Sequence, residues 1–166
     1  MHIGNQVIRG CTACYKCMEK KNRRCVFDDD CVNDCIQKMA AADGIILGCP
    51  TYFANIPGTM KTYMDDWNWK LKVDFTDKVG GAFATGGGQT GGKEHVVTSL
   101  LLFLINNRML VAGPLYQDAE GDDKWGEAGS SAMTGPLDPG VGDHELDAAR
   151  RLGERIARVA RKLKAP

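Results

Sequence analysis

Residues 44–55 read GIILGCPTYFAN, an apolar run that passes directly into a loop of polar and aromatic side chains. Within it, residues 45–49 show no alternation of polar and apolar positions, which is typical of a strand buried on both faces of a parallel sheet. Residues 79–85 and 109–113 have the same character. We therefore expect three short buried strands, the first of which ends in a loop that could bind a ligand.

Segments with helical periodicity separate these strands. The alternation of strands and helices predicts right-handed crossovers and an α/β fold whose parallel sheet is covered on both faces. Ligands of such sheets bind beyond the carboxyl ends of the strands, so the loops after the first two strands form the candidate site. The expected helices cover residues 32–42, 57 to about 70, 93–107 and, from a cap at Asp143, 143–164, and residues 114–142 are expected to form a long loop.

The composition is typical of one globular domain and favours neither nucleic acid nor a membrane as a partner. The chain has 166 residues, of which 43% are hydrophobic and 25% charged, so a core can form without disulfide bonds. Lysine plus arginine and aspartate plus glutamate each number 21, which leaves no net charge to attract nucleic acid or an anionic membrane. The longest nearly apolar stretch, residues 96–105, is too short to cross a bilayer. Residues 1–4 do not resemble a signal peptide, so we expect a single cytoplasmic domain over residues 1–166.

Cysteine is concentrated near the start of the chain, where four of the seven cysteines lie within residues 10–30. We expect a cysteine-rich loop here, because the odd total and the tight spacing suit ligands in a reducing compartment better than disulfide bonds. Four thiolates in a compact loop match the number and softness of ligands that a [4Fe–4S] cluster requires. Structural zinc and free or oxidised thiols remain open as alternatives. The candidate metal ligands are Cys11, Cys14, Cys17 and Cys25.

A glycine-rich loop, TGGGQTGG at residues 85–92, leads from the second strand into a helix, so its backbone amides can approach a ligand closely. Its spacing partly matches a dinucleotide-binding loop, but residues 109–113 do not end in the acidic side chain that would hold a ribose. It also matches most of a phosphate-binding loop up to Lys93, but Glu94 stands where a serine or threonine would bind magnesium. A nucleoside triphosphatase is therefore not favoured, and a plain flexible turn is the alternative.

The loop at residues 50–56 offers two aromatic rings, a hydroxyl and an amide, a mixture that suits a flat heteroaromatic ligand. Together with residues 84–89 and 143–153, the segment 44–55 resembles the flavodoxin-like NAD(P)H-dependent FMN reductases. Iron-sulfur flavoproteins and the quinone reductases similar to tryptophan-repressor-binding protein are related branches. The resemblance extends from about residue 10 to residue 164. It implies a flavodoxin-like three-layer sandwich with a mostly parallel sheet.

This resemblance also implies a cofactor site and an activity. Electrons would pass from NAD(P)H through FMN to a quinone, another small acceptor or a redox protein, and a [4Fe–4S] cluster in the cysteine loop could take part. Because the flavin performs the redox step, no acid-base residue is expected to be catalytic. By position, the ring and ribityl chain of FMN would be lined by Pro50, Thr51, Tyr52, Phe53, Asn55 and Ile56, and its pyrimidine edge would face Thr85, Gly86, Gly87, Gly88 and Gln89.

Related proteins form oligomers in which a neighbour helps to cover the flavin, so the resemblance implies a homodimer or homotetramer. Tyr63, Trp67 and Trp69 are the candidate contact residues, although the two tryptophans could equally anchor the core or a loop. Cys49 is often serine in the family and is given no catalytic role.

The chain departs from the family pattern at its start. Relatives begin with a strand, a phosphate-binding loop and a helix, none of which is found here, so a place in the sheet beside residues 45–49 is vacant unless residues 1–8, another chain or an altered strand order fills it. The FMN phosphate would lose several charge-assisted hydrogen bonds, each worth about 1.5 to 3 kcal/mol. The alternative function is therefore a non-enzymatic iron-sulfur or zinc-binding module on a truncated flavodoxin scaffold.

Overall fold

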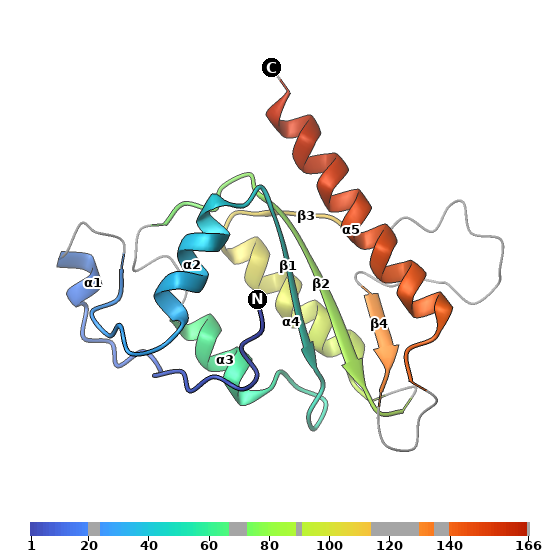
Figure 1. Ribbon diagram of the computed structural model, residues 1–166, viewed down its shortest axis with the longest axis horizontal. Coiled ribbons are helices and arrows are strands. Elements are labelled where there is room, and N and C mark those ends of the chain that lie inside the picture. Colours follow the sequence, from blue (N-terminus) through green and yellow to red (C-terminus); the bar gives the residue numbers. More distant parts are fainter. Residues whose placement is uncertain (20–23, 67–72, 89–90, 114–129, 135–139, 166) are drawn as a thin grey trace.

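The computed structural model describes residues 1–19, 24–66, 73–88, 91–113, 130–134 and 140–165. In this part of the chain, parallel strands form one sheet with helices on both of its faces (Figure 1). The elements run in the order α1 (Lys16–Glu19), α2 (Val32–Ala41), β1 (Gly44–Pro50), α3 (Gly58–Asp65), β2 (Val79–Gly86), α4 (Lys93–Asn106), β3 (Leu110–Val111), β4 (Ser130–Met133) and α5 (Asp143–Lys164).

Strand β2 lies at the centre of the sheet. β1 pairs with it over its whole length, from Gly44 opposite Val79 to Pro50 opposite Thr85. On the other side of β2, β3 pairs with its first two residues and β4 with its last four. The strands predicted at residues 45–49 and 79–85 are therefore confirmed, whereas the third is shorter than its predicted range.

The prediction of one long loop over residues 114–142 is wrong in one part, because β4 lies inside it. The sequence of β4, SSAM, has no apolar run that would indicate a buried strand. Its pairing partner is the carboxyl half of β2, beyond the two residues that β3 occupies. The strand is therefore recognised by its backbone pairing with β2, which its sequence pattern does not indicate. Residues 114–129 and 135–139 of the expected loop lie outside the described part.

The helices differ from the expected ones in a few details, and α2 and α4 each end one residue earlier than expected. α3 begins at Gly58 with Pro57 as its N-cap, and it ends at Asp65, while most of the predicted extension to residue 70 lies outside the described residues. α5 has Gly142, not Asp143, as its N-cap, because the Gly142 N–H donates a hydrogen bond of 2.9 Å to the Glu145 carboxylate. The short helix α1 lies inside the expected cysteine loop.

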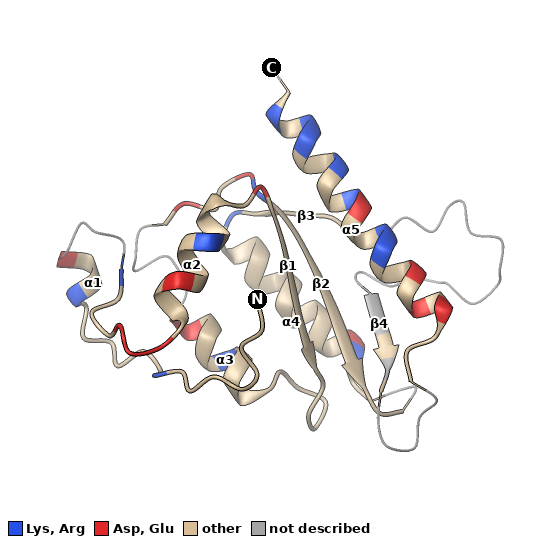
Figure 2. Ribbon diagram, in the orientation of Figure 1, with Lys and Arg blue, Asp and Glu red and all other residues tan. Residues whose placement is uncertain are grey.

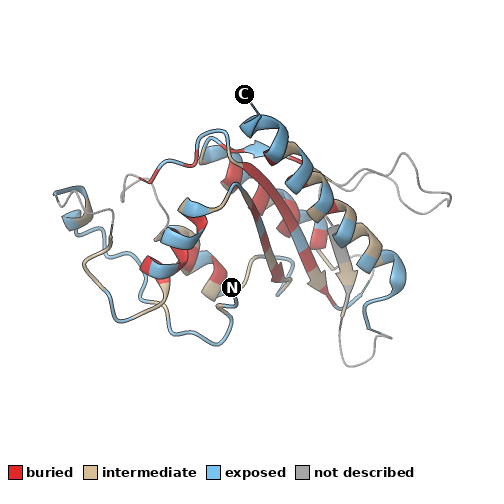
Figure 3. Ribbon diagram, turned by 45° about the horizontal axis from the view of Figure 1, so that its top comes forward, coloured by how far each residue is buried: buried red, intermediate tan, exposed pale blue. Residues whose placement is uncertain are grey.

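Two apolar layers hold the sheet. On one face, side chains of α2, α3 and α4 pack with Ile45, Leu47 and Cys49 of β1 in the larger core. On the other face, α5 packs Ile156 against the strands, and an added Cβ on Gly81 would lie only 2.5 Å from the Ile156 side chain. A strand glycine thus allows α5 to approach the sheet. Figure 3 shows β2 as largely buried, and Figure 2 shows the acidic start and basic end of α5, an order that suits the helix dipole.

The sheet is less covered beside β1. Ile46 and Phe83 lie on the same face of the sheet as α5, but they are 40% and 39% exposed. No described strand pairs with the outer edge of β1, and residues 1–8 do not form a strand. A cavity of about 290 Å³ separates residues 1–4 from β1. Residues 1–8 thus lie near the vacant place in the sheet without filling it.

Candidate flavin site

The ends of β1 and β2 bring two loops into contact. The Thr51 N–H donates a hydrogen bond of 2.7 Å to the Thr85 carbonyl, just beyond the last paired residues of β1. Farther along the loops, Gly92 has a left-handed φ of 83°, and a Cβ added to it would lie 2.5 Å from the Cβ of Ala54. The loops therefore touch at two points and form one surface at the carboxyl edge of the sheet.

The loop after β1 contains a tight turn that presents aromatic side chains. Tyr52 and Asn55 exchange backbone hydrogen bonds of 3.1 and 3.0 Å, and the two residues between them, Phe53 and Ala54, have φ values of 49° and 58°. Two positive φ values in succession define a turn that normally requires glycine or asparagine, and each such residue costs about 1–2 kcal/mol. The turn leaves Tyr52 61% exposed and the Phe53 side chain fully exposed.

Thr51 has the buried polar atom that a ligand could satisfy. Its hydroxyl oxygen is inaccessible to solvent and has no hydrogen-bond partner among the described residues. It lies beside Gly86, since a Cβ added there would be 3.5 Å from this oxygen. A buried hydroxyl without a partner costs about 1–3 kcal/mol. The residues present therefore fit a ligand that has polar atoms at the rim of a flat ring.

Lys93, the first residue of α4, contacts the glycine loop that precedes it. Its side chain is only 6% exposed, and its Nζ donates a hydrogen bond of 2.6 Å to the Gly88 carbonyl. The sequence suggested a comparison with the lysine of a phosphate-binding loop, but the structure folds this side chain back onto the loop itself. No sequence signal distinguished these two uses of the same residue.

The structure places the residues assigned to a flavin as follows. Tyr52, Phe53, Asn55, Gly87 and Gly88 are exposed, Pro50, Thr51, Ile56 and Thr85 are half-buried, Gly86 is buried, and Gln89 lies outside the described residues.

The four candidate metal ligands lie close enough to interact electrostatically. Burial raises the pKa of Cys17 above its ordinary value, and the neighbouring charges of Cys25, Cys14 and Cys11 raise it further. Cys11 and Cys14 are exposed, whereas Cys17 and Cys25 are half-buried. Within the described residues, no three His, Cys, Asp or Glu side chains are arranged to hold a metal ion. Four thiols are a donor set that suits a metal centre.

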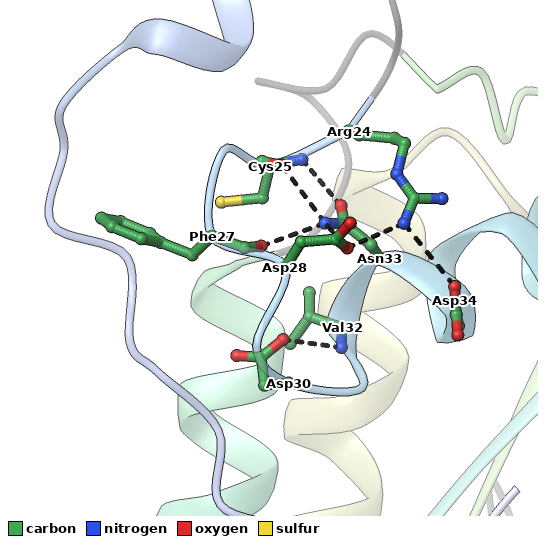
Figure 4. A network of polar contacts seen from close by, with 8 residues as sticks. All are labelled: Arg24, Cys25, Phe27, Asp28, Asp30, Val32, Asn33 and Asp34. Carbon is green, nitrogen blue, oxygen red and sulfur yellow. Dashed lines mark hydrogen bonds and ion pairs between the residues drawn. The ribbon is translucent and has the colours of Figure 1, made fainter.

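A buried asparagine that the sequence analysis missed fixes the last of these cysteines (Figure 4). Asn33 on α2 is 1% exposed, and its Oδ1 accepts a hydrogen bond of 2.7 Å from the Cys25 N–H. Its Nδ2 donates to the carbonyls of Cys25 and Phe27 and to the Asp28 carboxylate, at 3.2, 3.0 and 2.9 Å. Asparagine inside a helical pattern carries no signal for such a role, because the partners become neighbours only when the chain folds.

Two other groups are buried rather than reactive. Burial raises the pKa of the Cys49 thiol to about 11. Tyr63 is 3% exposed, its hydroxyl donates to the sulfur of Met39 at 2.8 Å, and burial raises its pKa. The prediction that Tyr63 contacts a neighbouring subunit is therefore wrong, because the side chain belongs to the core. Trp67 and Trp69 lie outside the described residues.

Comparison with known families shows which family the chain belongs to. A family model described as NADPH-dependent FMN reductase matches residues 2–121. The chain belongs to this family. It is thus a member of a family of NAD(P)H-dependent flavin oxidoreductases, and the resemblance drawn from the sequence is confirmed.

Relatives of this FMN reductase family member fall into two groups by name. An iron-sulfur flavoprotein of Methanocaldococcus jannaschii is 32% identical over 164 residues, which cover 98% of this chain and 80% of the relative. An iron-sulfur flavoprotein of Methanosarcina thermophila is 34% identical, over 67% of this chain and 58% of its own length. An NAD(P)H dehydrogenase (quinone) of Acidithiobacillus ferrooxidans is 34% identical over 75% of this chain and 66% of its own length. The chain thus spans only part of each relative.

Solved structures confirm the flavodoxin-like fold. A flavodoxin-like WrbA-like protein from Agrobacterium tumefaciens superposes with a TM-score of 0.60 at 27% identity, covering 79% of this chain and 74% of the other. An archaeal flavodoxin superposes with a TM-score of 0.54 at 20% identity, covering 76% and 71%. The α/β class and the mostly parallel sheet expected from the sequence are therefore correct. Within the described residues, no helix is long and apolar enough to span a membrane.

Proposed function

We propose that this chain is a single-domain cytoplasmic oxidoreductase that binds FMN at the joined loops and passes electrons from NAD(P)H to a quinone, another small acceptor or a redox protein. The observation that carries the proposal is the contact between the two loops around the buried, unpaired hydroxyl of Thr51. Membership of the FMN reductase family and a relative named NAD(P)H dehydrogenase (quinone) support it. Bound FMN would supply hydride acceptance and electron release.

The residues of the loop after β1 would bind the ring and shield it from water. Tyr52 and Phe53 offer exposed aromatic surface in a turn whose hydrogen bonds hold it in one conformation. Aromatic rings stack favourably on a flat heteroaromatic ligand, which would offset the cost of the two positive φ values. The half-buried Pro50 and Ile56 would complete an apolar wall, and the Thr51 hydroxyl and Asn55 amide would meet polar atoms.

The glycine loop would stabilise negative charge on the ligand. Gly87 and Gly88 are exposed and lack side chains, so their backbone amides can come close to the pyrimidine edge of the ring, which Thr85, Gly86 and Gln89 would flank. Backbone amides aimed at a developing charge stabilise it without titrating. The chain therefore needs no acid-base residue for this reaction.

The cysteine loop would hold a [4Fe–4S] cluster. Cys11, Cys14, Cys17 and Cys25 offer four soft donors whose charges already interact, and the iron-sulfur flavoprotein name of one relative supports this use. The incomplete coverage of β1 favours a second candidate function, an iron-sulfur or zinc-binding module without flavin chemistry. In a homodimer or homotetramer, a neighbouring subunit would cover Phe53, whose side chain is fully exposed in the single chain.

The test is anaerobic purification followed by an absorption spectrum and an FMN titration. An FMN enzyme will show the two absorption bands of a flavin, or will take them up with one FMN per chain, and NAD(P)H will bleach them. Iron and sulfide analysis will give about four of each per chain if the cluster is present. A colourless protein that neither binds FMN nor oxidises NAD(P)H would exclude the oxidoreductase, and bound iron or zinc in such a protein would favour the module.

A further inference from the structure

Lys93 occupies an unfavourable position for a lysine. Among the described residues it is the only charged side chain that is buried, and burying an ammonium group is costly. It is also the first residue of α4, where the positive end of the helix dipole disfavours a cation. Local rules that a sequence breaks in this way are typical of functional positions.

The side chain of Lys93 runs beneath the glycine loop and joins the two halves of the site. Its Nζ donates to the Gly88 carbonyl at 2.6 Å. Its aliphatic part passes the end of β2, since a Cβ added to Gly86 would lie 3.5 Å from the Lys93 Cγ and 3.2 Å from the Thr51 Cβ. The ammonium group thus lies behind the loop whose amides would face the pyrimidine edge of a flavin.

Two effects follow from this placement. The hydrogen bond ties the Gly88 carbonyl to the start of α4 and so limits the movement of the glycine loop at this residue. The positive charge, added to the positive end of α4, makes the electrostatic potential at the loop more favourable to an anion. Two-electron reduction adds negative charge to a flavin, so both effects should matter more for the reduced form than for the oxidised one.

We propose that Lys93 is a positioning residue that makes this site bind reduced FMN more tightly than oxidised FMN. The inference rests on the proposed flavin function and adds to it the group that sets the preference. In the reaction, NAD(P)H gives a hydride to FMN and becomes NAD(P)⁺, and the charge gained by the flavin is the charge that Lys93 stabilises through the loop.

The test compares Lys93→Met, which removes the charge and the hydrogen bond, with Lys93→Gln, which keeps a donor without the charge. Lys78→Met is the control, because the half-buried Lys78 likewise donates to a backbone carbonyl, that of Ala42 just before the start of β1, away from the two loops. The readouts are the Kd for oxidised FMN, from fluorescence quenching, and the two-electron reduction potential against a reference dye. Thermal unfolding of each apoprotein reports on folding.

For Lys93→Met we expect the affinity for oxidised FMN to fall by at most threefold. The affinity for reduced FMN should fall by at least a further tenfold. For a two-electron couple, this tenfold difference makes the reduction potential about 30 mV more negative. Lys93→Gln should recover the oxidised Kd but keep the lower potential, and Lys78→Met should change neither. If Lys93→Met does not fold, Lys93→Gln alone decides. An unchanged potential in the variant or variants that fold, or an equal loss for both redox forms, overturns the inference. Failure of the unaltered chain to bind FMN instead overturns the proposed function.

Discussion

Asn33 is a single side chain that organises a whole segment of the cysteine loop. It occupies a fully buried position on α2 and uses both its oxygen and its nitrogen on the backbone of residues 25–27. The half-buried Cys25 depends on it, because the amide oxygen holds the Cys25 N–H at 2.7 Å. The position of the fourth candidate ligand is therefore set from outside the cysteine motif.

Replacing Asn33 by alanine should lower the free energy of unfolding by about 2–3 kcal/mol, because the change removes three hydrogen bonds to half-buried backbone groups of Cys25 and Phe27. Urea unfolding of the apoprotein followed by circular dichroism measures this loss. Asn106→Ala is the matched control, since Asn106 is exposed at the end of α4 and its replacement should change stability by less than about 0.5 kcal/mol. Equal stability of the two variants would contradict the role of Asn33.

Cys49 should resist alkylation, because burial raises its pKa to about 11. The raised pKa means that the neutral thiol dominates up to that pH, and only the thiolate reacts with iodoacetamide. At pH 8 the exposed Cys11 should be labelled at least about 100-fold faster than Cys49 in the folded protein, and the rate at Cys49 should increase about tenfold per pH unit up to pH 10. Mass spectrometry of peptides after timed labelling gives both rates, and comparable rates at pH 8 would show that Cys49 is accessible and ionised.

The turn between β1 and α3 shows at the level of an element what a sequence can and cannot predict. The apolar run of β1 and the parallel-sheet rule predicted where the loop at residues 50–56 would lie. The positive φ values of Phe53 and Ala54 could not be predicted, because neither residue favours that conformation. The contact of Lys93 with Gly88 was equally hidden, since it depends on how the glycine loop folds over α4. Strand β4 was missed for the same kind of reason, as it is recognised by its backbone pairing with β2.

Ala54→Gly should stabilise the protein by about 0.5–1 kcal/mol, because glycine adopts the φ of 58° without strain. Chemical denaturation measures the change. Gly92→Ala is the opposite change on the other side of the same contact. It should lower the free energy of unfolding by about 2 kcal/mol or more, because alanine is unfavourable at a φ of 83° and its Cβ would collide with Ala54. A destabilised Ala54→Gly variant would show that the packing of the Ala54 methyl outweighs the strain.

At the scale of the whole molecule, the sheet has one open side. The outer edge of β1 has no described strand beside it, and Ile46 and Phe83 are partly exposed on the neighbouring face. The two loops proposed to bind a flavin, residues 50–56 and the described part of residues 85–92, follow the carboxyl ends of β1 and β2 and are in contact even though this side is open. The family resemblance implies that the phosphate of FMN is held by a loop for which the sequence analysis found no counterpart, whereas the ring would be held by residues 50–56 and 85–89.

If the residues present hold only the ring and ribityl chain, the 166-residue chain should bind riboflavin nearly as tightly as FMN. A phosphate held by three charge-assisted hydrogen bonds of about 1.5 kcal/mol each would favour FMN by about 4.5 kcal/mol, which is more than a thousandfold in Kd. Without that loop we expect the two Kd values to agree within about tenfold, because binding is then limited to the ring and ribityl contacts. Fluorescence titrations of both ligands against the same protein preparation measure the ratio, and inorganic phosphate at millimolar concentration should leave both titrations unchanged. A preference for FMN of a thousandfold or more, lost on adding phosphate, would mean that other residues of this chain have taken over the phosphate site.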